Sequence, residues 1–146
     1  MSRDNLRALR ACAAFAAASL LAVGAIACGG NSSTTTPSTP RTTETFSGTV
    51  QVGGSDFHSF RVGSTGTTDV TLTAASPPST IVMGLSLGTP DDAGNCNRLA
   101  GATVNVAAGS TPQLGTLSST ATLCVQVRDI GNQTSPVTYT VSVAHP

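Results

Sequence analysis

The stretch Val137–Val143, VTYTVSV, decides the fold, because a large apolar side chain occupies every second position and a small polar one lies between. Successive side chains of a β-strand point to opposite faces, so this pattern predicts a strand with one buried and one solvated face. Six earlier stretches alternate in the same way: Phe46–Val52, His58–Val62, Val70–Ala74, Ile81–Leu87, Val104–Val106 and Leu123–Val127. Turn residues such as Gly53-Gly54 and Pro77-Pro78 separate them, and no helical period competes. Short strands at this spacing predict an all-β fold, an antiparallel β-sandwich.

The residues before the strands have a different composition. Residues 1–10 carry Arg3, Arg7 and Arg10, and residues 11–27 form an unbroken run of apolar and small residues. A positive segment followed by such a run is the layout of a secretory signal peptide. The run is shorter than the ~20 apolar residues of a membrane-spanning helix. We therefore expect residues 1–27 to direct export.

The end of this run, Ala25-Ile26-Ala27-Cys28-Gly29, resembles the lipobox of bacterial lipoproteins, with Ala25 where Leu is commonest. The resemblance implies a diacylglyceryl group on the Cys28 thiol and an N-acyl chain on its amine, which together anchor a protein to a membrane. Gly29 in place of Asp is similar to lipoproteins released to the outer membrane of Gram-negative bacteria. An ordinary signal peptide cut near Ala27 is the alternative. We expect an exported protein, lipid-anchored to the cell envelope.

The segment after Cys28, residues 29–43, reads GGNSSTTTPSTPRTT and contains no large apolar residue. A Ser/Thr/Pro-rich segment of this kind has nothing to bury and predicts an extended, disordered linker. The expected organisation is a signal peptide over 1–27, the lipidated Cys and its linker over 28–43, and a β-sandwich domain over 44–146.

Cys96 and Cys124 are the two thiols that remain in the exported part beside Cys28. The chain has no Trp and one Tyr, so its core is modest and a covalent link would stabilise it. Export permits oxidation, and we expect a Cys96–Cys124 disulfide. Cys124 has the opposite parity to Leu123 and Val125, which places the bridge off the core face, where it would pin the loop at residues 91–98. Two free thiols or a metal site are the alternatives.

Two segments of the domain resemble bacterial pre-peptidase C-terminal domains. Gly54–Phe60, GSDFHSF, is similar to their D-x-[WY]-x-F strand, and Pro136–Val143 is similar to their closing Y-x-[LV]-x-V strand. His58 stands where that family prefers an aromatic residue. The resemblance covers about residues 44–146 and implies a jelly-roll-like sandwich that accompanies secreted proteins and is not itself catalytic.

The arrangement Asp56, His58 and Ser59 invites comparison with a hydrolase triad, in which a base must reach a hydroxyl. Adjacent strand residues point to opposite faces, so His58 and Ser59 cannot meet, and a packed His58 beside Phe60 is favoured. His145 lies next to the C-terminus and is expected to be exposed. No G-x-S-x-G elbow or phosphate-binding glycine loop occurs. We expect no enzymatic activity.

Two loops carry the oxygen ligands that calcium prefers: Asp91, Asp92 and Asn95 on one, and Asp129 with Asn132 on the other. The same residue types are favoured in turns for backbone reasons, and neither loop has EF-hand spacing. Plain turns are therefore the favoured interpretation. No cofactor other than the lipid is expected, with calcium kept as a weak alternative.

Glycan binding is a further alternative, because sugars stack on exposed aromatic rings. The rings after Cys28 are few: Phe46, Phe57, Phe60 and Tyr139. Phe57 alone has off-core parity, so the platform would be thin, and packing in the core or at a sheet edge is favoured.

Charge narrows the class of partner. Charged residues are 10% of the chain, and the basic residues after Cys28 are scattered: Arg41, Arg61, Arg98 and Arg128. Nucleic-acid binding needs clustered cations and is not expected. The sequence predicts a non-catalytic cell-envelope lipoprotein whose sandwich is structural, adhesive or binds proteins as an accessory module. A glycan- or calcium-binding module on the cell surface is the alternative.

Overall fold

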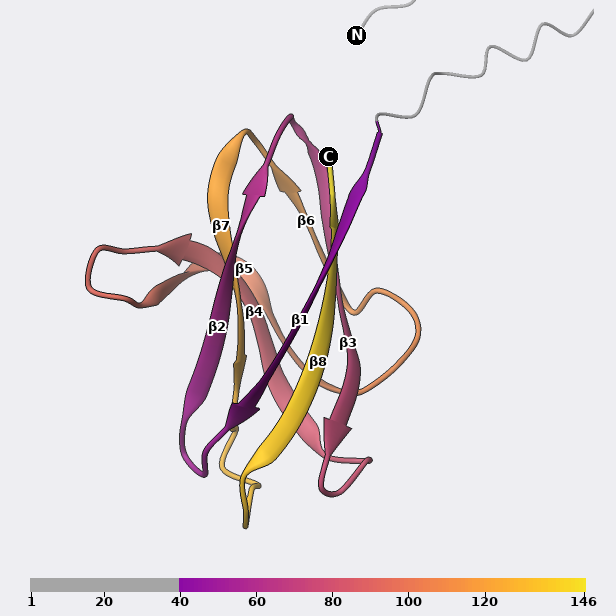
Figure 1. Cartoon of the computed structure of the whole chain (residues 1–146), viewed down its shortest axis with the longest axis vertical. Coiled ribbons are helices and arrows are strands. Elements are labelled where there is room, and N and C mark those ends of the chain that lie inside the picture. The colour runs from indigo at the N-terminus through magenta and orange to yellow at the C-terminus, as the bar shows by residue number, and fades with distance from the viewer. Residues whose placement is uncertain (1–39) are drawn as a thin grey trace, which may run out of the picture. The chain divides into compact units, whose positions relative to one another are not determined.

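Eight antiparallel strands and no helix make up residues 40–146, the part of the chain that the computed structural model describes (Figure 1). The first sheet, sheet A, contains in spatial order β1 (Thr42–Val50), β8 (Val137–His145), β3 (Gly66–Ser76) and β6 (Leu114–Ser118). The second, sheet B, contains β2 (Ser55–Val62), β7 (Ala121–Arg128), β4 (Val82–Pro90) and β5 (Cys96–Ala107). Chain neighbours mostly lie in opposite sheets, and the orders 1-8-3-6 and 2-7-4-5 are those of an eight-stranded jelly roll. The predicted all-β antiparallel sandwich is confirmed.

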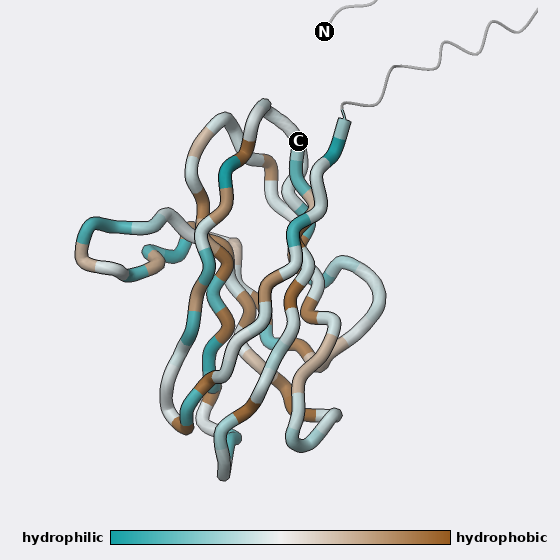
Figure 2. The backbone as a smooth tube through the Cα atoms, viewed as in Figure 1, coloured by the Kyte–Doolittle hydropathy of each residue, from teal (hydrophilic) through white to brown (hydrophobic). Residues whose placement is uncertain are grey.

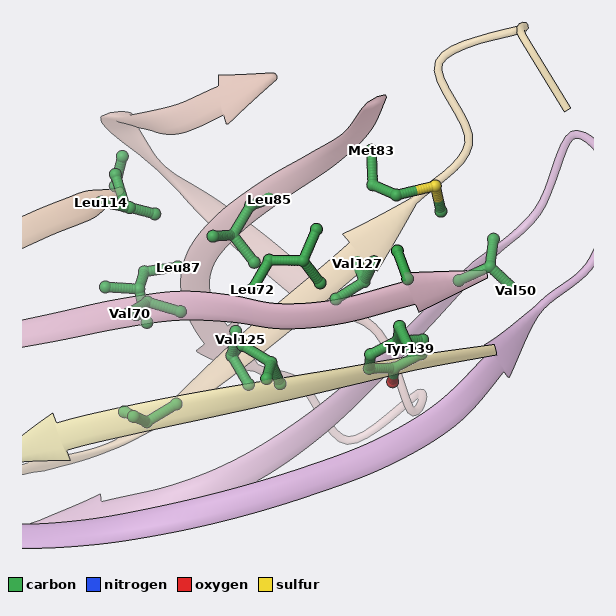
Figure 3. Close-up of a cluster of buried hydrophobic side chains, with 14 of the residues drawn as sticks. Val50, Val70, Leu72, Met83, Leu85, Leu87, Leu114, Val125, Val127 and Tyr139 are labelled. Atoms are coloured by element: carbon green, nitrogen blue, oxygen red, sulfur yellow. The ribbon is translucent and has the colours of Figure 1, made fainter. Parts of the chain in front are cut away.

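The core lies between the two sheets and is built from the predicted alternating positions. Along the strands hydrophobic and hydrophilic residues alternate (Figure 2). Leu72 of β3, Leu85 and Leu87 of β4 and Val125 of β7 are buried and lie within one cluster (Figure 3). Tyr139 of β8 packs in the same cluster. Burying apolar side chains from both sheets against each other is the main stabilising contribution in such a sandwich.

The first strand starts earlier and ends earlier than its pattern suggests. β1 begins at Thr42, two residues before the expected boundary at 44, because Thr42 and Thr43 pair with the end of β8. Just before the strand, the Arg41 guanidinium donates to the Asp69 carboxylate at 2.7 Å and to a backbone carbonyl of β8 at 2.7 Å. The expectation that Val52 faces the core is wrong. Its side chain is 54% exposed in the turn after β1, next to Gly53 with a φ of 72°.

A β-bulge corrects a second position. Ala74 has the parity of Val70 and Leu72, but the pairing of β3 with β8 shifts register between Leu72 and Ala74. One extra residue moves every following side chain to the other face. Ala75 is therefore buried and Ala74 is exposed.

Two strands differ from the prediction: β5 is longer than the predicted stretch, and β6 was not predicted. β5 begins at Cys96, and Val104 and Val106 occupy only its second half, after an irregularity opposite Ser86 and Gly88. β6 was missed, because of its five residues only Leu114 is a buried large apolar side chain. It pairs with the first part of β3 and forms an edge of sheet A.

Candidate functional site

The predicted disulfide is present. The Sγ atoms of Cys96 and Cys124 are bonded at 2.01 Å, with the Cα atoms 5.9 Å apart. Cys124 lies on β7 between the core residues Leu123 and Val125 but outside the core cluster, so the bridge lies off the core face, as predicted. It joins the start of β5 to β7 across β4. A Cβ atom on Gly88 of β4 would lie 2.8 Å from the Cys96 Sγ, so only glycine leaves room for this crossing.

Asp56, His58 and Tyr139 meet at the edge of the sandwich where β1 faces β2. The Tyr139 hydroxyl donates to the Asp56 carboxylate at 2.8 Å, and the His58 Nε2 lies 3.0 Å from the same phenol oxygen. Because the phenol proton is given to Asp56, the imidazole N–H is the donor to Tyr139. The His58 ring also stacks on Phe46, with centroids 5.0 Å apart.

This cluster is built as a packed polar network. Burial raises the pKa of the Tyr139 phenol, and the hydrogen bond to Asp56 raises it further, so the hydroxyl stays neutral. A Cβ atom on Gly48 of β1 would lie 2.8 Å from the Tyr139 hydroxyl oxygen, so the network fills the space available. Ser59 lies on the opposite face of β2, where its partner position is Cys124. The residues that resemble a triad are therefore not brought together as one.

His145 corrects an expectation. It is 3% exposed rather than open to solvent, although it is one residue from the end of the chain. Its Nε2 lies 2.9 Å from the Glu44 carboxylate, and its ring is 5.3 Å from that of Phe60. The cause is the pairing of β8 with β1, which continues to the last residue of the strand and draws His145 into the sandwich.

The first group of calcium candidates forms a self-contained turn between β4 and β5. The Asp91 carboxylate accepts backbone N–H groups of Ala93 at 3.0 Å and of Asn95 at 2.8 Å, and also the Asn95 side-chain amide. The backbone bond from Asn95 is the main cause that holds the Asp91 pKa below its ordinary value. Asp92 is exposed.

The second group lies at the other end of sheet B, because β4 and β7 run antiparallel. Asp129 accepts backbone N–H groups from Gly53 at 2.8 Å, Gly131 at 2.8 Å and Asn132 at 3.1 Å. The bond from Gly53 is the main cause that lowers its pKa. The structure does not bring Asp91 and Asp129 together, and residues 40–146 contain no group of three acidic, His or Cys side chains placed to hold a metal.

A groove on the outer face of sheet B was not found from the sequence. It is lined by Ser55 of β2, Gln126 and Arg128 of β7, Arg98 of β5, and the loop residues Gly53, Gly54 and Asp129. It is shallow and largely open to solvent, with a volume of about 290 Å³, just below the usual range of ligand sites. Phe57, the off-core ring singled out above, is half-buried and lies directly opposite Gln126 on the same face.

No helix within residues 40–146 is long and apolar enough to cross a membrane. Cys28, the expected lipidation site, and most of the expected linker lie outside the described residues. The chain matches no model of a known protein family and no curated protein.

Proposed function

We propose that this chain is an exported lipoprotein, anchored through Cys28, whose β-sandwich is a non-catalytic binding module of the cell envelope. The observation that carries the proposal is the Cys96–Cys124 disulfide in the domain that follows the leader. Disulfides persist in oxidising compartments outside the bacterial cytosol, which agrees with a signal peptide and lipobox. The resemblance to pre-peptidase C-terminal domains supports an accessory or adhesive role beside other envelope proteins.

The anchor is tested by expressing the full chain in a Gram-negative bacterium and measuring the intact mass of the membrane fraction. Cleavage before Cys28 and the added mass of a diacylglyceryl and an N-acyl group are the expected result. The control variant Cys28→Ser should lose both lipid groups and leave the membrane fraction. A wild-type protein that keeps residues before 28 and carries no fatty acid would overturn the anchor and the location together.

The absence of catalysis is part of the proposal, and the Asp56–His58–Tyr139 network supports it. Its hydroxyl belongs to a phenol with a raised pKa and donates to a carboxylate, so it is a poor nucleophile. We expect no hydrolysis of ester, peptide or glycoside substrates. A hydrolytic signal that disappears in His58→Gln, while the melting temperature is unchanged, would contradict this.

A second candidate function is glycan binding, and the groove on the outer face of sheet B favours it. The groove combines two guanidinium groups, an amide and a hydroxyl beside a half-buried ring. A few convergent polar groups beside an aromatic surface are typical of small-ligand sites. Retention of the full chain on polysaccharide columns is the direct test. Calcium dependence is the third reading, tested by the melting temperature with calcium and with chelator.

A further inference from the structure

Three arginines share the outer face of sheet B. Arg61 of β2 and Arg128 of β7 each follow a buried core residue and so project from that face. Arg98 of β5 is placed on it by its pairing with Gly88. Among residues 40–146 none of the three has a carboxylate within ion-pair distance, whereas Arg41, just before β1, is paired with Asp69. The strand positions of this face contain no Asp or Glu. The strand positions of this face are therefore cationic, and the carboxylate that lines the groove, Asp129, belongs to the loop after β7.

Arg98 and Arg128 line the same groove, because the strand between them, β4, carries only small residues on this face. The outer-face positions of β4 are Gly84, Ser86 and Gly88, so this central strand raises no long side chain. The Arg128 side chain lies across Gly84, where a Cβ atom would be 2.7 Å from its Cγ and 3.1 Å from its Cζ. Arg98 on one edge strand therefore lines the same groove as Ser55 on the opposite edge strand.

Two buried polar atoms on this face lack a partner. The Ser86 hydroxyl is fully buried and makes no hydrogen bond, and the Nε of Arg128 is buried and unpartnered. Ser86 lies directly opposite Gln126, which lines the groove. Buried polar groups are nearly always satisfied. Of these two residues only Arg128 lines the groove, so its guanidinium is the group with hydrogen-bonding capacity left for a polar ligand there.

We propose that this groove binds the carboxylate of an acidic sugar, a uronate residue within a polysaccharide, between Arg98 and Arg128. The inference rests on the glycan-binding candidate above. Guanidinium groups bind carboxylates through paired N–H donors, and this geometry gives orientation as well as affinity. The Gln126 amide and Ser55 hydroxyl hydrogen-bond sugar hydroxyls. Phe57 offers its ring to the apolar side of the neighbouring sugar.

The charges favour one carboxylate over a phosphate. Arg98 and Arg128 bring two positive charges and Asp129 one negative charge, which remains ionised because its N–H partners lower its pKa. A monoanion is matched by this balance, whereas a phosphate dianion would lie against the Asp129 carboxylate. The disulfide supports the site as well. Arg98 follows Cys96 by two residues, so the bond to Cys124 fixes its strand relative to the strand of Arg128.

The test uses the full chain extracted in detergent and polygalacturonate as the probe, measured by affinity electrophoresis and calorimetry. Fully methyl-esterified polygalacturonate is the matched ligand control, because it keeps the sugar backbone and removes the charge. Arg98→Gln and Arg128→Gln should each weaken binding about tenfold or more, as expected for loss of a charge-assisted hydrogen bond. Arg61→Gln is the matched protein control, on the same face but outside the groove, and should change affinity less than twofold.

Equal binding of the methyl ester would overturn the inference, because it would show that the carboxylate is not recognised. An equal loss of affinity in Arg61→Gln would also overturn it, because it would show that binding does not depend on the groove. Poly-glutamate that binds as tightly with the same dependence on Arg98 and Arg128 would make an acidic protein the occupant and overturn the saccharide. Binding of a neutral glycan through the groove would keep the glycan function and reject the uronate. No binding to any glycan would reject both. An unchanged melting temperature shows that each variant is folded.

Discussion

Removing the Cys96–Cys124 bridge should lower stability by an amount that the loop length sets. The two residues are 28 positions apart. In the chain-entropy treatment, opening a loop of that length stabilises the unfolded chain by roughly 3.5 kcal/mol at 25 °C, because its conformational entropy rises. For a domain of about 100 residues this corresponds to a melting temperature lower by about 15 to 25 °C. The perturbation is the double variant Cys96→Ala/Cys124→Ala, which leaves no buried thiol or hydroxyl.

The assay is urea unfolding followed by the fluorescence of Tyr139, which is the single Tyr of a chain without Trp and is buried in the core. The unfolded variant is also less constrained, so the dependence of free energy on urea should become steeper. Reductant present during unfolding should bring the wild type to the variant's stability and leave the variant itself unchanged. A variant that stays within about 1 kcal/mol of the oxidised wild type would refute the entropic reasoning.

Three other measurements follow from the packing. Tyr139→Phe should lower the free energy of unfolding by about 1 to 3 kcal/mol, because the Asp56 carboxylate loses the hydroxyl donor at 2.8 Å. An unchanged free energy in a urea titration would mean that water replaces that donor. Leu85 lies in the centre of the core, and Leu85→Ala should lower the free energy of unfolding by about 2 to 5 kcal/mol. Leu117 is 76% exposed on β6, and Leu117→Ala should change it by less than about 0.5 kcal/mol. Similar losses for the two variants in thermal melts would contradict the assignment of the core. The pKa of Asp129 is lowered from 3.8, so its contribution is present above that pH and is lost as pH falls through the lower folded value. Melting from pH 2 to 7 should therefore show an acid slope that is shallower in Asp129→Asn, and parallel slopes would contradict the assignment.

Strand alternation predicted most of the fold because it reports which side of a sheet each residue occupies. It gave the seven stretches that overlap strands, and it placed Cys124 off the core from its parity alone. It failed at Ala74, where a bulge inserts one residue and inverts the pattern without changing composition. It failed also at β6, whose weak apolar content is compensated by pairing with β3.

The candidate site was harder to predict, because it depends on which strands become neighbours. Arg98 and Arg128 are 30 positions apart in the sequence. They line one groove because β4 lies between their strands and carries only small residues on the outer face. A signal was present in Gly84-Leu85-Ser86-Leu87-Gly88, where small residues alternate with large ones. His145 was misjudged for a related reason. Proximity to the chain end suggests exposure, but backbone pairing with β1 encloses it.

The contact of Arg41 with the end of β8 fixes the end of the sandwich at which the chain enters β1. The chain enters β1 and leaves β8 at the same extremity, with Thr42 paired to His145. β1 then runs for nine residues, so its turn at Gly53 lies roughly 25 Å farther along the sandwich. That turn borders the groove of Arg128 and Ser55. The groove therefore lies toward the end of the sandwich opposite His145, so a probe or fusion partner added after Pro146 would leave its arginines unobstructed.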